Sequence, residues 1–165
     1  MLKRLKLFFR ILHVPSLQVV AFINFSKKCR KIPLFGKILS TVFDNLILYI
    51  FSLETTSSSL EINNLIIGHS TGVVLGGNGI RSNGDLHISS GGVFARRYNQ
   101  SKTIDNNKDY FFDIDGDLTV GANSVLLGPL SIKGPTIIGA LSVVTKDIID
   151  PGVYVGSPAK KIRDL

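Results

Sequence analysis

Residues 114–149 repeat with a period of six. Every sixth residue is aliphatic, and a second set of inward candidates follows each of these positions by four residues. The first set is Ile114, Val120, Leu126, Ile132, Ile138 and Val144; the second is Leu118, Ser124, Leu130, Thr136, Ser142 and Ile148. This period fits neither a helix nor an alternating strand. It is typical of three short strands joined by tight corners, about 18 residues per turn, with successive turns stacked at the strand spacing. We therefore predict a mainly β fold, a parallel β-helix.

The repeat is less regular before residue 114. Counting back by sixes from Val73 gives Ile67, Glu61 and Thr55, while Leu65 and Thr71 continue the second set. The phase slips over residues 75–92, and no sixfold pattern is present over residues 95–113. We predict a coil over residues 52–165 with a loop extruded at about 95–112. Such loops often line binding sites, although a simple surface excursion fits the same pattern.

The first 51 residues have a different character. Residues 1–50 hold nine Lys and Arg against Asp44 alone, a net charge of +8, so the remaining residues sum to −1. Apolar residues recur at helical spacing, and Pro15 and the segment KIPLFG divide the region into three predicted helices, the last over residues 36–53. A module of this kind could join subunits, which we favour, or contact an anionic membrane surface. Nucleic acid fits less well.

The number of cysteines and the length of the apolar segments indicate where in the cell the protein is expected. No apolar run approaches the 18 residues of a spanning helix. A single cysteine, Cys29, rules out an intramolecular disulfide and favours a reducing compartment. We expect a cytoplasmic protein, or one held peripherally at the inner face of the membrane.

A histidine occurs in the apolar segment IIGHSTGVVLGG, residues 66–77. His69 could fill a strand corner or act as a general base, because a neutral imidazole can accept a hydroxyl proton near neutral pH. The segment alone leaves both interpretations open.

Four segments carry a resemblance to a known family: VGANSV (120–125), IGALSV (138–143), GHSTGVVLG (68–76) and VGSPAKKI (155–162). They resemble the hexapeptide-repeat acyltransferases, and more narrowly serine acetyltransferase and its relatives, which include O-acetyltransferases of bacterial capsule and exopolysaccharide synthesis. The resemblance implies a left-handed parallel β-helix behind the N-terminal helical module. It also implies an acetyl-CoA-dependent O-acetyltransferase that forms a homotrimer, or a dimer of trimers, with each site between two adjacent coils.

The resemblance also assigns roles to residues. It implies that His69 is the general base and that Glu54, fifteen positions earlier, holds the other imidazole nitrogen; Glu54 could instead be a solvated charge. It implies that acetyl-CoA is bound by small-residue corners, by the closing segment and by lysines at its phosphates. These residues are Ala122, Gly139, Ala140, Lys146, Pro158, Lys160 and Lys161.

Three positions depart from the serine acetyltransferase pattern. Gly68 replaces the aspartate that precedes the histidine, and Tyr110 and Phe111 replace an Arg-His pair. The loss of charged contacts argues against an amino acid, and aromatic residues suit a sugar face. We therefore predict a sugar hydroxyl of a bacterial surface polysaccharide or its precursor as acceptor, with Tyr110 and Phe111 binding it.

The sequence also fits two other functions. One is a serine or other small-molecule O-acetyltransferase, and another is a non-catalytic β-helical assembly protein. His87 lies 18 residues after His69, but the phase slip leaves stacking of the two in doubt. No metal is expected, because the coil supplies no third histidine.

Overall fold

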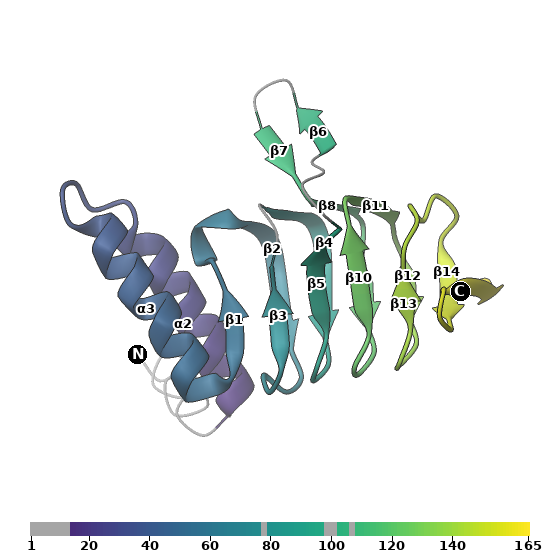
Figure 1. Cartoon of the computed structure of the whole chain (residues 1–165), viewed down its shortest axis with the longest axis horizontal. Coiled ribbons are helices and arrows are strands. Elements are labelled where there is room, and N and C mark those ends of the chain that lie inside the picture. Colours follow the sequence, from purple (N-terminus) through teal and green to yellow (C-terminus); the bar gives the residue numbers. More distant parts are fainter. Residues whose placement is uncertain (1–13, 77–78, 98–101, 106–107) are drawn as a thin grey trace, which may run out of the picture.

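The computed structural model describes residues 14–76, 79–97, 102–105 and 108–165, with a helical hairpin at one end of a long β coil (Figure 1). Helix α2 (Pro15–Cys29) begins at a proline, which suits the first helical turn, and carries Lys27 and Lys28 in its last turn. Helix α3 (Gly36–Phe51) ends where Ser52 turns left-handed. This helix confirms the last predicted one to within two residues. The first predicted helix lies outside the described residues.

A buried hydroxyl network fixes the helical hairpin to the coil. The Ser26 hydroxyl donates to Asp44 Oδ1 at 2.8 Å, and the Ser57 hydroxyl donates to Ser26 Oγ at 2.8 Å. Ser57 belongs to the short 3₁₀ helix η1 (Ser57–Ser59) that follows the first strand. Because these hydroxyls are buried and paired, α2, α3 and the first turn of the coil form one packed unit.

Five parallel strands stack to form one face of the coil, sheet A. They are β1 (Leu53–Thr55), β3 (Val73–Leu75), β5 (Val93–Arg96), β10 (Val125–Gly128) and β13 (Val143–Val144). Adjacent strands pair in register, so Val74, Val93, Val125 and Val143 form one row.

Sheet B covers the other two faces. Its long strands β2 (Leu60–Ile67) and β4 (Ile80–Ile88) pair with each other, and shorter strands stack on the two halves of β4. The first half continues in β8 (Phe112–Asp115) and β11 (Leu130–Lys133); the second continues in β9 (Leu118–Val120), β12 (Thr136–Ile138) and β14 (Gly152–Val155). Strand β15 (Lys160–Arg163) pairs antiparallel with β14 and closes the coil.

Both predicted hexad sets point inward. All twelve residues from Ile114 to Ile148 in the two sets are buried, none more than 3% exposed. Paired strands here are 18 residues apart, as between Leu118 and Thr136. The predicted β-helix is therefore confirmed over this region.

Before residue 114 the predicted phase is wrong at two positions. Glu61 and Thr71 are exposed, whereas Ile67 and Val73 are buried as predicted. The turn is longer here: Leu53 pairs with Val73, 20 residues on. Strand β2 also shifts register between Ile62 and Asn64. A pattern counted by sixes cannot follow these two changes.

The extruded loop leaves the coil between β5 and β8. It contains an antiparallel pair, β6 (Lys102–Asp105) and β7 (Lys108–Tyr110), which projects away from the coil (Figure 1). This position matches the predicted loop at about 95–112. Among the helices in the described ranges, none is long and apolar enough to cross a membrane.

Candidate functional site

His69 lies in the corner that leads from β2 into β3, and its side chain is exposed. Three further corners stack beyond it, at residues 89–92, 121–124 and 139–142, each leading into the next strand of sheet A. Backbone bonds of 2.9–3.0 Å join them, from Gly91 N to Thr71 O, Asn123 N to Ser90 O, and Leu141 N to Ala122 O. We call this row of corners the N-terminal edge of sheet A.

The corner with His69 is two residues longer than its neighbours. Gly68 N donates to Ile88 O, as Ser89 N donates to Val120 O one turn further on, so Gly68 and Ser89 are equivalent. Thr71 and Ser90 are equivalent in the same way, which leaves His69 and Ser70 as the additional residues. They extend the corner, and this explains how a histidine in an apolar segment reaches solvent.

A second histidine lies beside this corner. His87 is exposed on β4 and pairs in register with Ile66. A Cβ placed on Gly68 would lie 3.8 Å from His87 Nε2. His87 is therefore a candidate site residue that the sequence left in doubt; its 18-residue spacing from His69 was the available signal.

Glu54 lies on β1, at the end of the row formed by Val74, Val93 and Val125. It lines a hollow of about 320 Å³ between α3 and sheet A, together with Asp44 and Thr55. His69 does not line this hollow, and the described part of the chain shows no hydrogen bond between His69 and Glu54. The predicted pairing of the two remains a prediction.

The small-residue corners predicted to bind acetyl-CoA share the edge with His69. Ala122 and Ala140 occupy equivalent positions two and three turns beyond Thr71. At the strand spacing, Ala140 is about 14 Å along the edge from the His69 corner. Gly139 N donates to Tyr154 O at 2.8 Å, so its amide is used within the coil.

Lys146, Pro158 and Lys160, which are predicted to bind acetyl-CoA, lie close together. They line a hollow of about 300 Å³ with Thr145 and Tyr154, at the corner that follows β13. Arg97 donates to Thr145 O at 2.9 Å, so the residue after β5 also reaches this corner. These groups lie where the strands of sheet A end, which we call its C-terminal edge.

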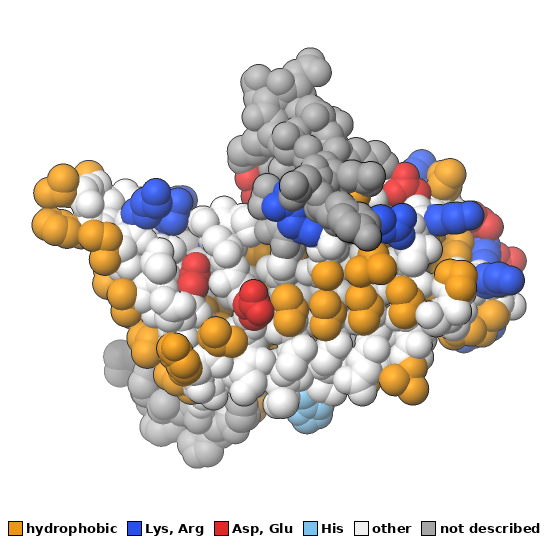
Figure 2. Space-filling view, in the orientation of Figure 1, with side chains coloured by type: hydrophobic (Ala, Val, Ile, Leu, Met, Phe, Trp, Pro, Cys, Tyr) orange, Lys and Arg blue, Asp and Glu red, His pale blue; other side chains and the backbone are white. Residues whose placement is uncertain are grey.

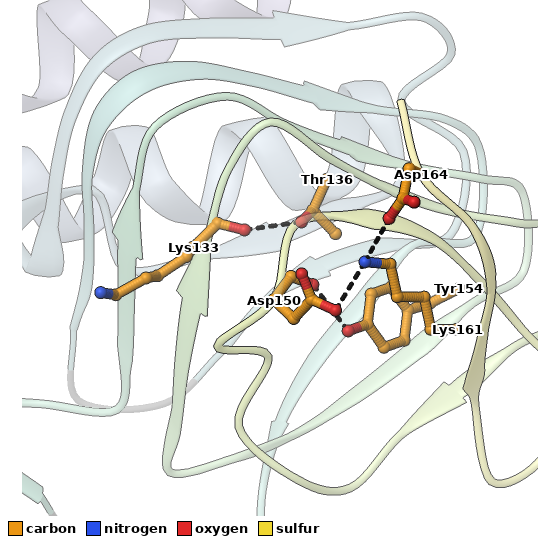
Figure 3. Close-up of polar contacts among 6 residues, drawn as sticks. All are labelled: Lys133, Thr136, Asp150, Tyr154, Lys161 and Asp164. Carbon is orange, nitrogen blue, oxygen red and sulfur yellow. Dashed lines mark hydrogen bonds and ion pairs between the residues drawn. The ribbon is translucent and has the colours of Figure 1, made fainter.

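Lys161 is held elsewhere. Its ammonium group forms ion pairs of 2.6 Å with Asp150 and Asp164, and Tyr154 donates to Asp150 O (Figure 3). The hydrogen bonds to Asp150 and Asp164 raise the pKa of Lys161, and the same contact lowers the pKa of Asp164. Lys161 thus ties β15 to the last turn and does not line the hollow of Lys146 and Lys160.

The loop residues predicted to bind an acceptor do not lie near His69 in this chain. Tyr110 ends β7, and the hairpin projects from the C-terminal edge (Figure 1). Phe111 is fully buried, and the guanidinium of Arg96 lies 4.5 Å from the centre of its ring. The exposed guanidinium of Arg96, and not the ring of Phe111, is therefore the group that faces solvent here.

The outward face of sheet A joins the two edges. Figure 2 shows a row of hydrophobic side chains across these strands, and the register identifies Val74, Val93, Val125 and Val143 as one such row. The corresponding face of sheet B is polar: Arg81 pairs with Asp113, and Asn83 donates to Asp115. Within the described residues, no group of His, Cys, Asp and Glu could hold a metal ion.

No protein-family model matches the chain. The known proteins described next, to which the chain is similar, are all serine acetyltransferases. Serine acetyltransferase 2 of Arabidopsis thaliana is 28% identical over 130 residues, 77% of this chain and 37% of the relative. Soybean serine acetyltransferase complexed with serine superposes with a TM-score of 0.71 at 18% identity, covering 92% of this chain and 59% of the other. The Brucella abortus enzyme in complex with coenzyme A gives 0.75 at 19%, covering 91% and 56%.

The chain has the fold of serine acetyltransferases. The match extends over more than nine tenths of the chain and therefore includes the helical hairpin as well as the coil. This confirms the predicted fold class, a left-handed parallel β-helix behind N-terminal helices. The chain spans less than two thirds of the length of these relatives.

Proposed function

We propose that this protein is an acyl-CoA-dependent O-acetyltransferase of the serine acetyltransferase type. The observation that carries the proposal is the extended corner that exposes His69 on the same edge as the stacked corners of Ala122 and Ala140. A scaffold protein would not need two additional residues to bring an imidazole into solvent. This argues against a non-catalytic assembly protein.

The chemistry follows from the groups at that edge. His69, as neutral imidazole, takes the proton of the acceptor hydroxyl as its oxygen attacks the thioester carbonyl of acetyl-CoA. The tetrahedral intermediate then collapses, the carbon–sulfur bond breaks, and CoA leaves as its thiol with the proton returned by the imidazolium. The backbone amides of Ala122 and Ala140 are the candidate donors to an oxyanion there, because the neighbouring corner amides already donate within the coil.

Acetyl-CoA is the proposed donor, and a relative with the same fold binds coenzyme A. The ammonium groups of Lys146 and Lys160 line one hollow, so they can contact phosphate groups as charge-assisted partners. Lys161 is a weaker candidate than the sequence suggested, because two carboxylates already neutralise it.

For the acceptor, the comparisons favour the alternative hypothesis, serine or another small molecule, over the predicted sugar. The relatives are serine acetyltransferases, and one is complexed with serine. We therefore propose serine or a similar small hydroxyl compound as acceptor. A sugar hydroxyl is the second candidate, because Gly68 lacks the carboxylate that would pair with the ammonium group of an amino acid.

The distribution of these residues favours a site built from two copies. One chain holds His69, Ala122 and Ala140 at the N-terminal edge of sheet A, and Lys146 and Lys160 at the C-terminal edge. The face between them is apolar and partly exposed, as expected of a surface that packs against another copy. We propose that sheet A packs against a second copy in a homotrimer, so that both sets of residues meet at one interface.

Steady-state CoA release tests the function. The protein is given acetyl-CoA with serine, with related small hydroxyl compounds and with a panel of sugars and oligosaccharides. Turnover that depends on serine or a small analogue supports the proposal as stated, and turnover on a sugar alone supports the second candidate. An absence of both turnover and acetyl-CoA binding would contradict an acetyltransferase.

A further inference from the structure

The turn between α2 and α3 presents an apolar surface to solvent. We call residues 28–38 the hairpin tip. Within it Leu34 is 87% exposed, Ile38 65%, Phe35 64% and Ile32 49%. Figure 2 shows hydrophobic side chains gathered at the far end of the helical hairpin, with Lys and Arg side chains next to them. Contiguous exposed apolar side chains of this kind mark interaction surfaces.

The tip is a well-formed turn. Lys31 N donates to Lys28 O, Ile32 N to Cys29 O, and Gly36 N to Ile32 O, at 3.0–3.1 Å. Gly36 packs so tightly that a Cβ there would lie 2.5 Å from Cys29 O. The apolar residues are therefore held outward by a fixed backbone.

Leu34 has an unfavourable backbone conformation that no packing of its own offsets. Its φ is 71°, a left-handed conformation that a residue with a Cβ seldom adopts and that glycine adopts readily. The side chain is the most exposed of the large hydrophobic residues described. A leucine that is strained and yet unburied suggests that its side chain is used in an interaction outside the folded chain.

Four cations surround these apolar residues: Lys28, Arg30, Lys31 and Lys37, all exposed. None of them forms an ion pair with the residues that the structure describes. Lys28, Arg30 and Lys31 line a cleft of about 1240 Å³ between α2 and sheet B. Across it, Asp113 is already paired with Arg81. Glu61 and Asp115 also line this cleft, but no ion pair joins the four tip cations to a carboxylate among the described residues.

We propose that the hairpin tip docks on a membrane surface that contains anionic lipid. The apolar side chains would enter the boundary between headgroups and acyl chains, and the four cations would contact the headgroup phosphates. A second copy of the chain is a poor occupant of this surface, because two hairpin tips that face each other would bring their like-charged Lys and Arg side chains together. Charge complementarity therefore selects an anionic bilayer.

Co-sedimentation of the full chain with vesicles tests this docking. Vesicles of phosphatidylcholine are compared with vesicles that also contain phosphatidylglycerol, at low and at high salt. The proposal expects binding to the anionic vesicles that weakens with salt, and little binding to the neutral ones. Lys28→Gln and Lys31→Gln should each weaken it about fivefold. Absence of binding, or equal binding to both vesicle types, would overturn the proposal.

Leu34→Gly separates a lipid contact from a structural role. Glycine suits the backbone at this position, so thermal stability should not fall, while vesicle binding should weaken about tenfold or more. Leu141→Gly is the matched control: Leu141 has a φ of 60° and is 72% exposed, but lies at a corner of the coil. Its binding should be unchanged. Vesicle binding that persists in Leu34→Gly, or a change in oligomeric state in its place, would refute the docking.

Discussion

At the scale of residues, the corner before β3 departs from the stacked pattern around it. His69 and Ser70 are additional there, and His87 lies next to Gly68 from the neighbouring turn. The sequence motif was enough to predict His69 as a candidate base, because the histidine and the rest of the motif lie in one continuous segment. The contact between Gly68 and His87 was not predictable, since it depends on a register that the phase slip conceals.

Gly68→Asp tests the acceptor at this corner. The nearest atoms to a Cβ there are 3.7 and 3.8 Å away, an ordinary contact distance, so the variant should fold with wild-type stability. The carboxylate would lie beside His87 and offer a partner to the ammonium group of an amino acid. We expect kcat/KM for serine to rise about tenfold, which is the value of one charged contact of about 1.4 kcal/mol. Unchanged kcat/KM for serine in a correctly folded variant would argue for the sugar.

At the scale of elements, the regular coil was predictable because each inward position repeats its environment. The hexads from Ile114 to Val144 are buried throughout. The earlier turns were predictable only in outline: the extended His69 corner and the shift within β2 displaced Glu61 and Thr71 outward. The division of the candidate residues between two edges was also hidden, since a linear repeat does not say on which side of a strand each corner falls.

Two neighbouring residues of strand β10 test whether side chains alternate between the inside and the outside of the coil. Leu126 is fully buried, whereas its neighbour Leu127 faces outward. Leu126→Ala should reduce the free energy of unfolding by about 2–5 kcal/mol, because it leaves a cavity within the coil. In a monomer, Leu127→Ala should reduce the free energy of unfolding by less than half as much as Leu126→Ala. Denaturant unfolding of the two variants measures the difference, and equal losses would contradict the inward stack.

The closing strand β15 should depend on pH through Lys161. The raised pKa of Lys161 means that its contribution is present below the ordinary lysine pKa and is lost as pH rises through the raised value. The lowered pKa of Asp164 means that its contribution is present above the ordinary aspartate pKa and is lost as pH falls through the lowered value. Lys161→Met should therefore speed amide exchange in β15 near neutral pH, and should have much less effect at a pH low enough to protonate Asp164. An effect of equal size at both pH values would refute the ion-pair explanation.

At the scale of the whole molecule, the proposed site needs more than one copy of the chain. A single chain places His69 and the Lys146 hollow at opposite edges of sheet A, separated by about 13 Å along the strand direction and by three turns of the coil. Val93→Glu and Val125→Glu put charge into the apolar row between them and should dissociate a trimer into monomers. Lys133→Glu, on the polar outward face of β11, is the matched control and should leave the assembly intact. Light scattering gives the molar mass, and a wild-type monomer would contradict a shared site.

His69 is the residue on which the proposed chemistry depends most, and one measurement tests its role. Acetyl-CoA turnover with the best acceptor is compared among the wild type, His69→Ala and Ser70→Ala, which alters the other additional residue of the same corner. We predict that kcat falls about 10²–10⁴-fold in His69→Ala, as expected of a general base, with acetyl-CoA binding retained. Ser70→Ala should keep most of the wild-type rate. Turnover in His69→Ala equal to that of the wild type would contradict the assignment of His69 as the base.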